Sequence, residues 1–294
     1  MIKYDLHVHS NYSSDASQSI EELFQRARKG KIKYLAICDH DNIESIPEAY
    51  KIAPQYKIVY IPGVELSCSS DEFTPLIPIN TGIHILGLNI QYDKDLFNEA
   101  MTPVKNASNN RKIKLINLLN DLGYDIGFDE IKPFTTSKIK EALVSKGHFS
   151  DQKQAKKFLN SEIITSVLPS VRLKIQEAID LIHKLGGKAI WAHPYCGENK
   201  LFFDHEQVCQ MMDYLITQGI DGFEAFHLYT MDDRRTDNIL NYVEKFNLIY
   251  TIGSDRHHAD NRYGDKYYSF EDKIIPYEKH INGIERIIKD RLLK

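Results

Sequence analysis

Cysteine is scarce in this chain, with four residues among 294. None of the four has C-x-x-C spacing, so neither a disulfide framework nor a zinc-finger site is indicated, and we expect reduced packing residues. No run approaches the roughly 18 consecutive apolar residues of a membrane span. Met1 leads directly into the first expected strand, so we also expect no secretory signal. These absences favour a cytoplasmic protein that does not act at a membrane.

A long basic stripe for duplex DNA is also missing. The whole chain has a formal charge of −4, yet residues 101–160 carry eleven Lys or Arg against six Asp or Glu. This local balance of +5 leaves −9 for the remainder of the chain. An acidic body suits a site for several divalent cations, and the basic segment could attract an anionic substrate to them. Alternatively, these lysines form only a solvated helix face.

Strand-like runs alternate with helical patterns along most of the chain. Ser19 and Glu22 fit a capping box ahead of one helix, and Gly30 fits its end. The alternation predicts an α/β protein with a mainly parallel sheet, closed or distorted into a barrel. Residues 93–167 show only helical patterns. We therefore expect a barrel domain from residues 1–92 and 168–294, with residues 93–167 forming an all-helical insertion.

A potential metal ligand lies at or near the end of most strand-like runs. His7 and His9 alternate along the first run, so their side chains should leave the same face. Later runs deliver Asp39-His40-Asp41, Glu65, His84, His193 and Asp255-Arg256-His257. Active sites of strand–helix barrels are assembled at the rim where the strands end. A set of histidines and carboxylates without a thiolate suits Mn²⁺, Zn²⁺ or Fe²⁺ better than Ca²⁺.

These motifs resemble one known family from residue 3 to about residue 260. They are Asp5-Leu6-His7-Val8-His9-Ser10, Asp39-His40-Asp41, Gly63-Val64-Glu65-Leu66-Ser67, His84-Ile85-Leu86-Gly87, Ala192-His193-Pro194 and Gly253-Ser254-Asp255-Arg256-His257. The family is the PHP (polymerase and histidinol phosphatase) superfamily. The order of the motifs most resembles its stand-alone branch with a helical insertion, whose members hydrolyse nucleotide phosphates or trim RNA from its 5′ end. The resemblance implies a distorted (β/α)7 barrel of the PHP type.

The resemblance further implies a trinuclear metal centre of Mn²⁺, Zn²⁺ or Fe²⁺, with Mg²⁺ as the alternative at the weakest site. The ligands of the first metal would be His7, His9, Glu65 and Asp255. The ligands of the second would be Glu65, His84 and His193, with Glu65 bridging the two metals. The ligands of the third would be Asp15, His40 and His257. Catalytic roles would fall on His193, Asp255, Glu65 and His227, and Asp39 would orient a histidine.

The implied activity is metal-dependent hydrolysis of phosphoesters by a metal-bridging hydroxide. Expected substrates are nucleotides, such as a nucleoside 3′,5′-bisphosphate or AMP, or short 5′-phosphorylated RNA. Arg111 lies on the expected long helix of the insertion and is expected to bind a substrate phosphate. His227 either contacts substrate, donates a proton or packs at a strand end. The family's Arg-x-His pair is replaced here by Thr136-Ser137-Lys138, which leaves the exact substrate open.

Three other functions stay open. Histidinol phosphatase is disfavoured because the insertion follows the His84 run and continues through three helices. A metal-dependent amidohydrolase also begins with His-x-His, but Asp15, His40 and His257 together argue against it. A silent module that only binds metal or a protein partner would be expected to lose ligands, and all nine positions are present. The sequence does not indicate the oligomeric state.

Overall fold

The computed structural model describes residues 3–73, 76–77, 81–127, 136–168, 171–198, 201–227, 230, 233–258 and 286–287. The chain separates into two compact units. The sheet unit comprises Met1–Asn98 and Leu173–Lys294, and the helical unit comprises Glu99–Arg172. The boundaries drawn from the sequence, at 92/93 and 167/168, lie five or six residues earlier. The assignment of the units as domains stays a prediction.

The regular elements follow the alternation expected from the sequence. Those before the insertion are β1 (Lys3–Val8), α1 (Ile20–Lys29), β2 (Ile32–Ile37), α2 (Ile46–Tyr56), β3 (Val59–Ser69), the short helix η1 (Asp71–Phe73) and β4 (Gly82–Leu88). The long helix α3 (Lys94–Asp121) leads into α4 (Thr136–Ser145), α5 (Gln152–Leu159) and α6 (Glu162–Thr165). The remaining elements are α7 (Ile175–Lys184), β5 (Lys188–Trp191), β6 (Cys196–Gly197), β7 (Leu201–Phe202), α8 (His205–Thr217), β8 (Gly222–Phe226), α9 (Asp233–Lys245) and β9 (Ile249–Ile252).

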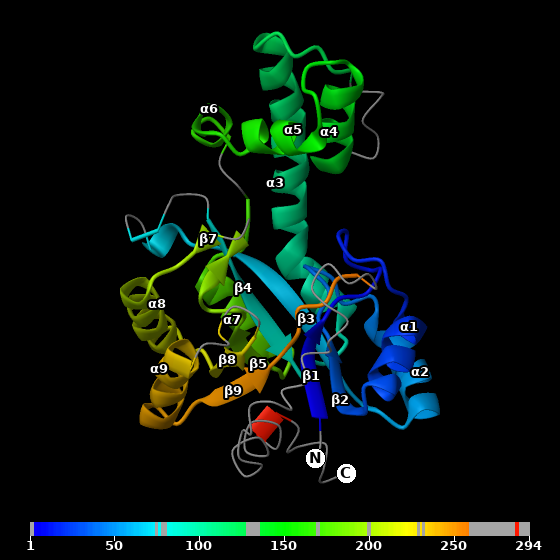
Figure 1. The fold of residues 1–294 in the computed structure, drawn as a ribbon, viewed down its shortest axis with the longest axis vertical. Helices are drawn as coiled ribbons and strands as arrows, with labels where there is room; N and C mark the ends of the chain where they lie inside the picture. The colour runs from blue at the N-terminus through cyan, green and yellow to red at the C-terminus, as the bar shows by residue number, and fades with distance from the viewer. Residues whose placement is uncertain are drawn as a thin grey trace. The chain divides into compact units, whose positions relative to one another are not determined.

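Seven strands form one sheet in the order β1-β2-β3-β4-β5-β8-β9 (Figure 1). Every neighbouring pair is parallel except those of β4, which runs antiparallel to both β3 and β5. The two edge strands meet at one end of the sheet. There the Asp255 N–H donates to the His7 carbonyl at 2.8 Å, and the His9 N–H donates to the Arg256 carbonyl at 2.8 Å. The sheet therefore curls back on itself, and the expected α/β fold is confirmed.

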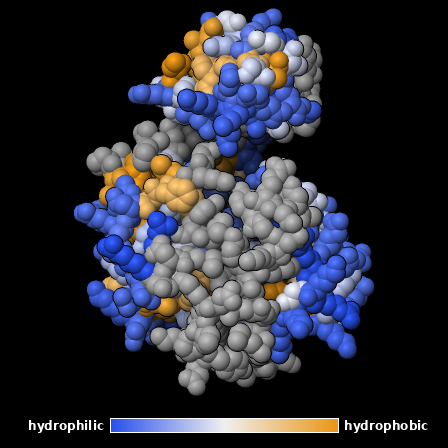
Figure 2. Space-filling model, viewed as in Figure 1, coloured by the Kyte–Doolittle hydropathy of each residue, from blue (hydrophilic) through white to orange (hydrophobic). Residues whose placement is uncertain are grey.

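Helices cover the outer side of this sheet, and their sequences explain where they begin and which face they bury. Helix α1 begins with the expected capping box, in which Ser19 Oγ accepts from the Glu22 N–H and Glu22 accepts from the Ser19 N–H. Helix α7 packs against β3, β4 and β5 and buries Ile175, Ala178 and Ile182. Figure 2 shows hydrophilic side chains over the outer side of α1 and α2. Among the described helices, none has the length and apolar character to cross a membrane.

The helical unit has an apolar core of its own. Its buried residues are Leu115, Ile116, Leu119, Ile126, Ile139, Ala142, Leu143, Ala155, Leu159, Ile164 and Leu168. The aromatic rings of Tyr124, Phe149 and Phe158 pack on one another and against this core. These aromatics of the insertion therefore stabilise its fold.

Truncation of one core leucine is expected to destabilise the helical unit selectively. Leu119 is fully buried, so Leu119→Ala leaves a cavity and should cost about 2–5 kcal/mol of unfolding free energy. Leu122 is 45% exposed only three residues away, so Leu122→Ala is the matched control and should change stability little. Urea unfolding followed by circular dichroism measures both. Equal losses from the two substitutions would contradict this account of the core.

Candidate metal centre

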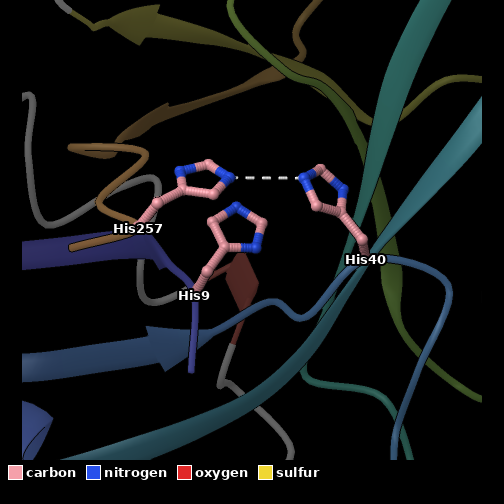
Figure 3. Close-up of side chains that lie close together, drawn as sticks. All are labelled: His9, His40 and His257. Carbon is pink, nitrogen blue, oxygen red and sulfur yellow. Dashed lines mark hydrogen bonds between the residues drawn. The ribbon is translucent and has the colours of Figure 1, made fainter. Parts of the chain in front are cut away.

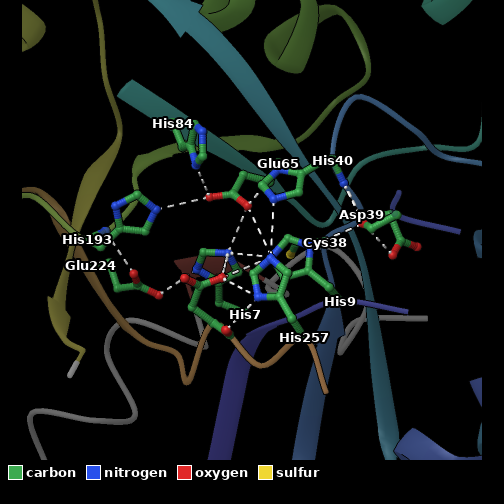
Figure 4. Close-up of polar contacts among 12 residues, drawn as sticks. His7, His9, Cys38, Asp39, His40, Glu65, His84, His193, Glu224 and His257 are labelled. Carbon is green, nitrogen blue, oxygen red and sulfur yellow. Dashed lines mark hydrogen bonds and ion pairs between the residues drawn. The ribbon is translucent and has the colours of Figure 1, made fainter. Parts of the chain in front are cut away.

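Four side chains from three separate parts of the chain converge on one point at the rim of the sheet. His7, His9, Glu65 and Asp255 each offer an atom within 4.8 Å of the others. Figure 4 shows the first three of these side chains close together. The two Nε2 atoms of His7 and His9 lie 3.2 Å apart, and Glu65 Oε2 lies 3.2 Å and 3.1 Å from them. Ligands about 2.1 Å from one tetrahedral ion lie roughly 3.4 Å apart. The spacing of these nitrogens and oxygens therefore fits a shared cation.

The second oxygen of Glu65 faces a different pair of histidines. Glu65 Oε1 lies 2.9 Å from His84 Nδ1 and 3.3 Å from His193 Nε2. Glu65 lies within β3, and His84 lies near the start of β4. Because β4 is antiparallel, its beginning reaches the same rim as the ends of the parallel strands. The Glu65 carboxylate thus has one oxygen in each donor group, as the bridging position requires.

A third group lies on the more exposed side of the centre. Figure 3 shows the rings of His9, His40 and His257 facing one another, with His40 Nε2 and His257 Nε2 3.4 Å apart. Asp15 Oδ2 lies 3.5 Å from the first and 3.6 Å from the second, and Asp15 is about half exposed. His40 Nδ1 also approaches Glu65 Oε2 at 3.2 Å. The structure therefore brings all nine predicted ligands together, and it places His40 closer to Glu65 than the assignment to a separate third metal suggested.

The opposite nitrogen of several rings is held by an acceptor of the protein. The pairs are His7 Nδ1 with Glu224 Oε1 at 3.1 Å, His9 Nδ1 with Ser13 Oγ at 3.2 Å, His84 Nε2 with Glu198 Oε1 at 3.5 Å, His193 Nδ1 with the Cys196 carbonyl at 2.6 Å and His257 Nδ1 with the Asp255 carbonyl at 2.9 Å. Metal-binding histidines almost always make such a second bond, which fixes the tautomer. Asp39 reaches His9 through Ser13, whose hydroxyl donates to Asp39 Oδ1 at 3.1 Å. The donor set is therefore arranged as divalent metals require.

The buried charges shift each other's pKa values strongly. Burial alone would lower the pKa of His7, but the Glu65, Glu224 and Asp255 carboxylates outweigh burial and raise it well above its usual range. Burial alone would raise the pKa of Glu65, but the surrounding histidines hold it well below its usual range. His40 behaves differently, because burial lowers its pKa to about 3. Protons on the imidazoles thus balance the carboxylates in a place where bound cations would do the same.

His227 borders the centre from β8. Its Nε2 lies 3.9 Å from Asp255 Oδ2, and its ring lies 5.5 Å from that of His193. Burial lowers the pKa of His227 to about 4, so the ring is neutral at neutral pH. A neutral imidazole can orient a ligand or substrate by hydrogen bonding, and the catalytic role of His227 stays a prediction.

Arg111 belongs to the helical unit. Its guanidinium donates from Nε and Nη2 to the Leu168 carbonyl, at 3.1 Å and 2.8 Å. Burial, followed by the nearby charge of Arg172, lowers the pKa of Arg111. Its role as a phosphate-binding residue stays a prediction.

Unusual backbone conformations occur at three positions of the rim. Asp41, His193 and Asp255 have φ values of 48°, 34° and 50°, in the left-handed region that non-glycine residues rarely adopt. Such strain persists only where the surrounding structure holds it, and it clusters at functional sites. Gly253 has a related role, because a Cβ at this position would collide with Glu224 Oε1 and His7 Cβ. Only glycine therefore allows β9 to approach the His7–Glu224 pair.

Sequence reasoning missed two acidic residues of the centre, Glu224 and Glu198. Glu224 is fully buried in β8. The signal was present, because a carboxylate inside the apolar run Gly222–Phe226 must find partners in the interior. Glu198 precedes β7, and no apolar run surrounds it in the sequence.

Comparisons with known proteins agree with this geometry. The family model described as "PHP domain" matches residues 5–183. A 5′-3′ exoribonuclease of Haemophilus influenzae is 30% identical over 260 residues, covering 87% of this chain and 90% of the relative. A phosphoribosyl 1,2-cyclic phosphate 1,2-diphosphodiesterase of Eggerthella lenta is 23% identical, covering 86% of this chain and 93% of the relative.

Two solved structures share the fold at low sequence identity. An amidohydrolase from Chromobacterium violaceum gives a TM-score of 0.67 at 21% identity, covering 87% of this chain and 88% of the other. A metal-dependent phosphoesterase from Bifidobacterium adolescentis gives 0.66 at 22% identity with the same coverage. The matched model spans more than half of the chain, and the exoribonuclease relative matches nearly its full length. The chain therefore belongs to the PHP-domain family of metal-dependent phosphoester hydrolases.

Proposed function

We propose that this enzyme removes phosphate from nucleotides, such as a nucleoside 3′,5′-bisphosphate or AMP, or cleaves short 5′-phosphorylated RNA. The observation that carries the proposal is the convergence of nine predicted ligand residues, Glu65 among them, with the two Glu65 oxygens facing separate histidine side chains. Bound there, divalent cations would polarise water and neutralise the charge of the phosphoryl oxygens. We propose three such cations, as Mn²⁺, Zn²⁺ or Fe²⁺. A cytoplasmic location stays a prediction.

In the proposed reaction, the side chains of the centre hold the donor groups in position and offer hydrogen bonds. Glu65 keeps two donor groups at a fixed separation, and His227 offers a neutral ring beside Asp255. We expect a substrate phosphate to approach from the side of Asp15, His40 and His257, whose side chains are partly exposed. The presence of this third group disfavours amidohydrolase chemistry, which needs fewer ligands.

A substrate panel with Mn²⁺ tests the proposal. It contains AMP, adenosine 3′,5′-bisphosphate, a short 5′-phosphorylated RNA, a ribosyl 1,2-cyclic phosphate, histidinol phosphate, an amide and a lactone. Turnover of a nucleotide or the RNA supports the proposed class. Preference for histidinol phosphate would favour the alternative assignment as a histidinol phosphatase. Hydrolysis of only the amide or lactone would refute phosphoester specificity.

The stereochemistry of the reaction gives a separate expected result. We propose direct attack of water on phosphorus, without a phosphorylated enzyme. Hydrolysis of a chiral phosphate ester in ¹⁸O-labelled water should therefore incorporate one solvent oxygen and invert the phosphorus centre. Net retention, measured by ³¹P NMR of the product, would indicate two displacements and rule out this pathway.

A further inference from the structure

The buried carboxylate of Glu224 contacts two parts of the centre at once. Its Oε1 lies 3.1 Å from His7 Nδ1, and its Oε2 accepts a hydrogen bond from the backbone N–H of His193 at 2.9 Å. Glu224 is 0% exposed, so no water replaces either bond. The two contacted residues belong to different predicted donor groups, since His7 faces Glu65 Oε2 and His193 faces Glu65 Oε1.

We infer that Glu224 is a positioning residue that sets the metal affinity of both donor groups through His7 and His193. The inference rests on the proposed function, because it assumes that the cluster binds metal. Among the described residues, Glu224 belongs to none of the groups whose ligand atoms lie close enough together to hold one ion.

The tautomer of His7 provides the physical reason. An acceptor at Nδ1 requires the ring to carry its proton there, which leaves a lone pair on Nε2. Nε2 is the nitrogen that faces His9, Glu65 and Asp255. Glu224 therefore keeps His7 in the one neutral form that can bind a cation at this point.

The backbone of His193 provides the second reason. His193 has a φ of 34°, in a region that non-glycine residues rarely adopt. The following residue is Pro194, which restricts the backbone of His193 further. The hydrogen bond from its N–H to Glu224 is one of the contacts that hold this conformation. It thereby aims the His193 ring at Glu65.

Both bonds need an acceptor, and only a carboxylate offers one at each oxygen. In Glu224→Gln, the amide can accept from one partner only, and its NH₂ group must face the other. If the NH₂ group faces His7, it favours the tautomer with a proton on Nε2; if it faces His193, two donors oppose each other. Glu224→Asp keeps both oxygens but is one methylene shorter, so it reaches one partner at a time.

Metal binding of the full-length protein tests the inference directly. Mn²⁺ titration of the chelator-treated protein, followed by electron paramagnetic resonance, is compared among wild type, Glu224→Gln, Glu224→Asp and the exposed control Glu244→Gln. Outer partners of metal-bound histidines typically change affinity by about 10–100-fold. We expect a loss of this size for Glu224→Gln, a smaller loss for Glu224→Asp and none for the control.

A second readout separates positioning from a general structural role. If Glu224 acts by positioning, a high Mn²⁺ concentration should restore most of the phosphate-release kcat of Glu224→Gln. Unchanged Mn²⁺ affinity in a folded Glu224→Gln would overturn the inference, as would a lost kcat that excess Mn²⁺ does not restore. Absence of Mn²⁺ binding in the wild type would instead overturn the proposed function, and this inference with it.

Discussion

Glu65→Gln is expected to abolish activity almost completely, with kcat/KM falling about a thousandfold or more, which corresponds to roughly 4 kcal/mol. The two oxygens of Glu65 face separate groups of predicted metal-binding histidine nitrogens. A neutral amide has the same shape, but it cannot compensate two cations held close together. We therefore expect the variant to lose bound metal as well as turnover.

The measurement pairs metal content with phosphate release. Metal per chain is determined by mass spectrometry on protein purified without chelator, and activity is measured with Mn²⁺ on the nucleotide substrates. Glu244→Gln makes the same chemical change at an exposed position of α9 and should match the wild type in both. A Glu65→Gln protein with full metal content and full turnover would refute the bridging role.

Removal of metal is expected to lower thermal stability as well as activity. Ions that bind only the folded protein stabilise it by mass action, by about 4 kcal/mol at a thousand times Kd. With an unfolding entropy of about 2.1 cal/mol/K per residue, this corresponds to a Tm shift of roughly 7 °C for a chain of 294 residues that unfolds as one. The stabilisation should be large because Glu65 and Glu224 are fully buried charges, which the cations would compensate.

Differential scanning fluorimetry measures this shift with and without chelator. Mn²⁺ added back should restore both Tm and phosphate release, and Glu65→Gln should respond weakly to either treatment. A wild-type Tm unaffected by chelation, in protein shown to have lost its metal, would contradict a stabilising role for the ions.

Much of this arrangement could be anticipated from local patterns. The His7–His9 alternation predicts two imidazoles side by side, because a strand sends every second side chain to one face. Residues that follow parallel strands meet at one rim, so Asp255 and His193 could be expected near His7. The capping pair Ser19 and Glu22 was equally readable, because both partners lie within one helical turn.

Other features depend on pairings that sequence alone does not encode. The position of His84 depends on the antiparallel direction of β4, and the sequence predicted a mainly parallel sheet without identifying this exception. The approach of His40 to Glu65 depends on a single parallel β-bridge between Glu65 in β3 and His40, which lies beyond the end of β2. Glu224 required knowledge of its neighbours, because nothing in its own strand shows that His7 and His193 face it.

The bonds between β1 and the segment after β9 also govern when this enzyme can become active during synthesis. His7 and His9 leave the ribosome early, but their partners at Asp255 and Arg256 emerge about 250 residues later. At elongation rates of about 5–20 residues per second this interval is roughly 13–50 s. A nascent chain in this period has an unpaired sheet edge and an incomplete ligand set. Hydrolysis of a phosphoester is therefore postponed until Asp255 and Arg256 have emerged and paired with β1.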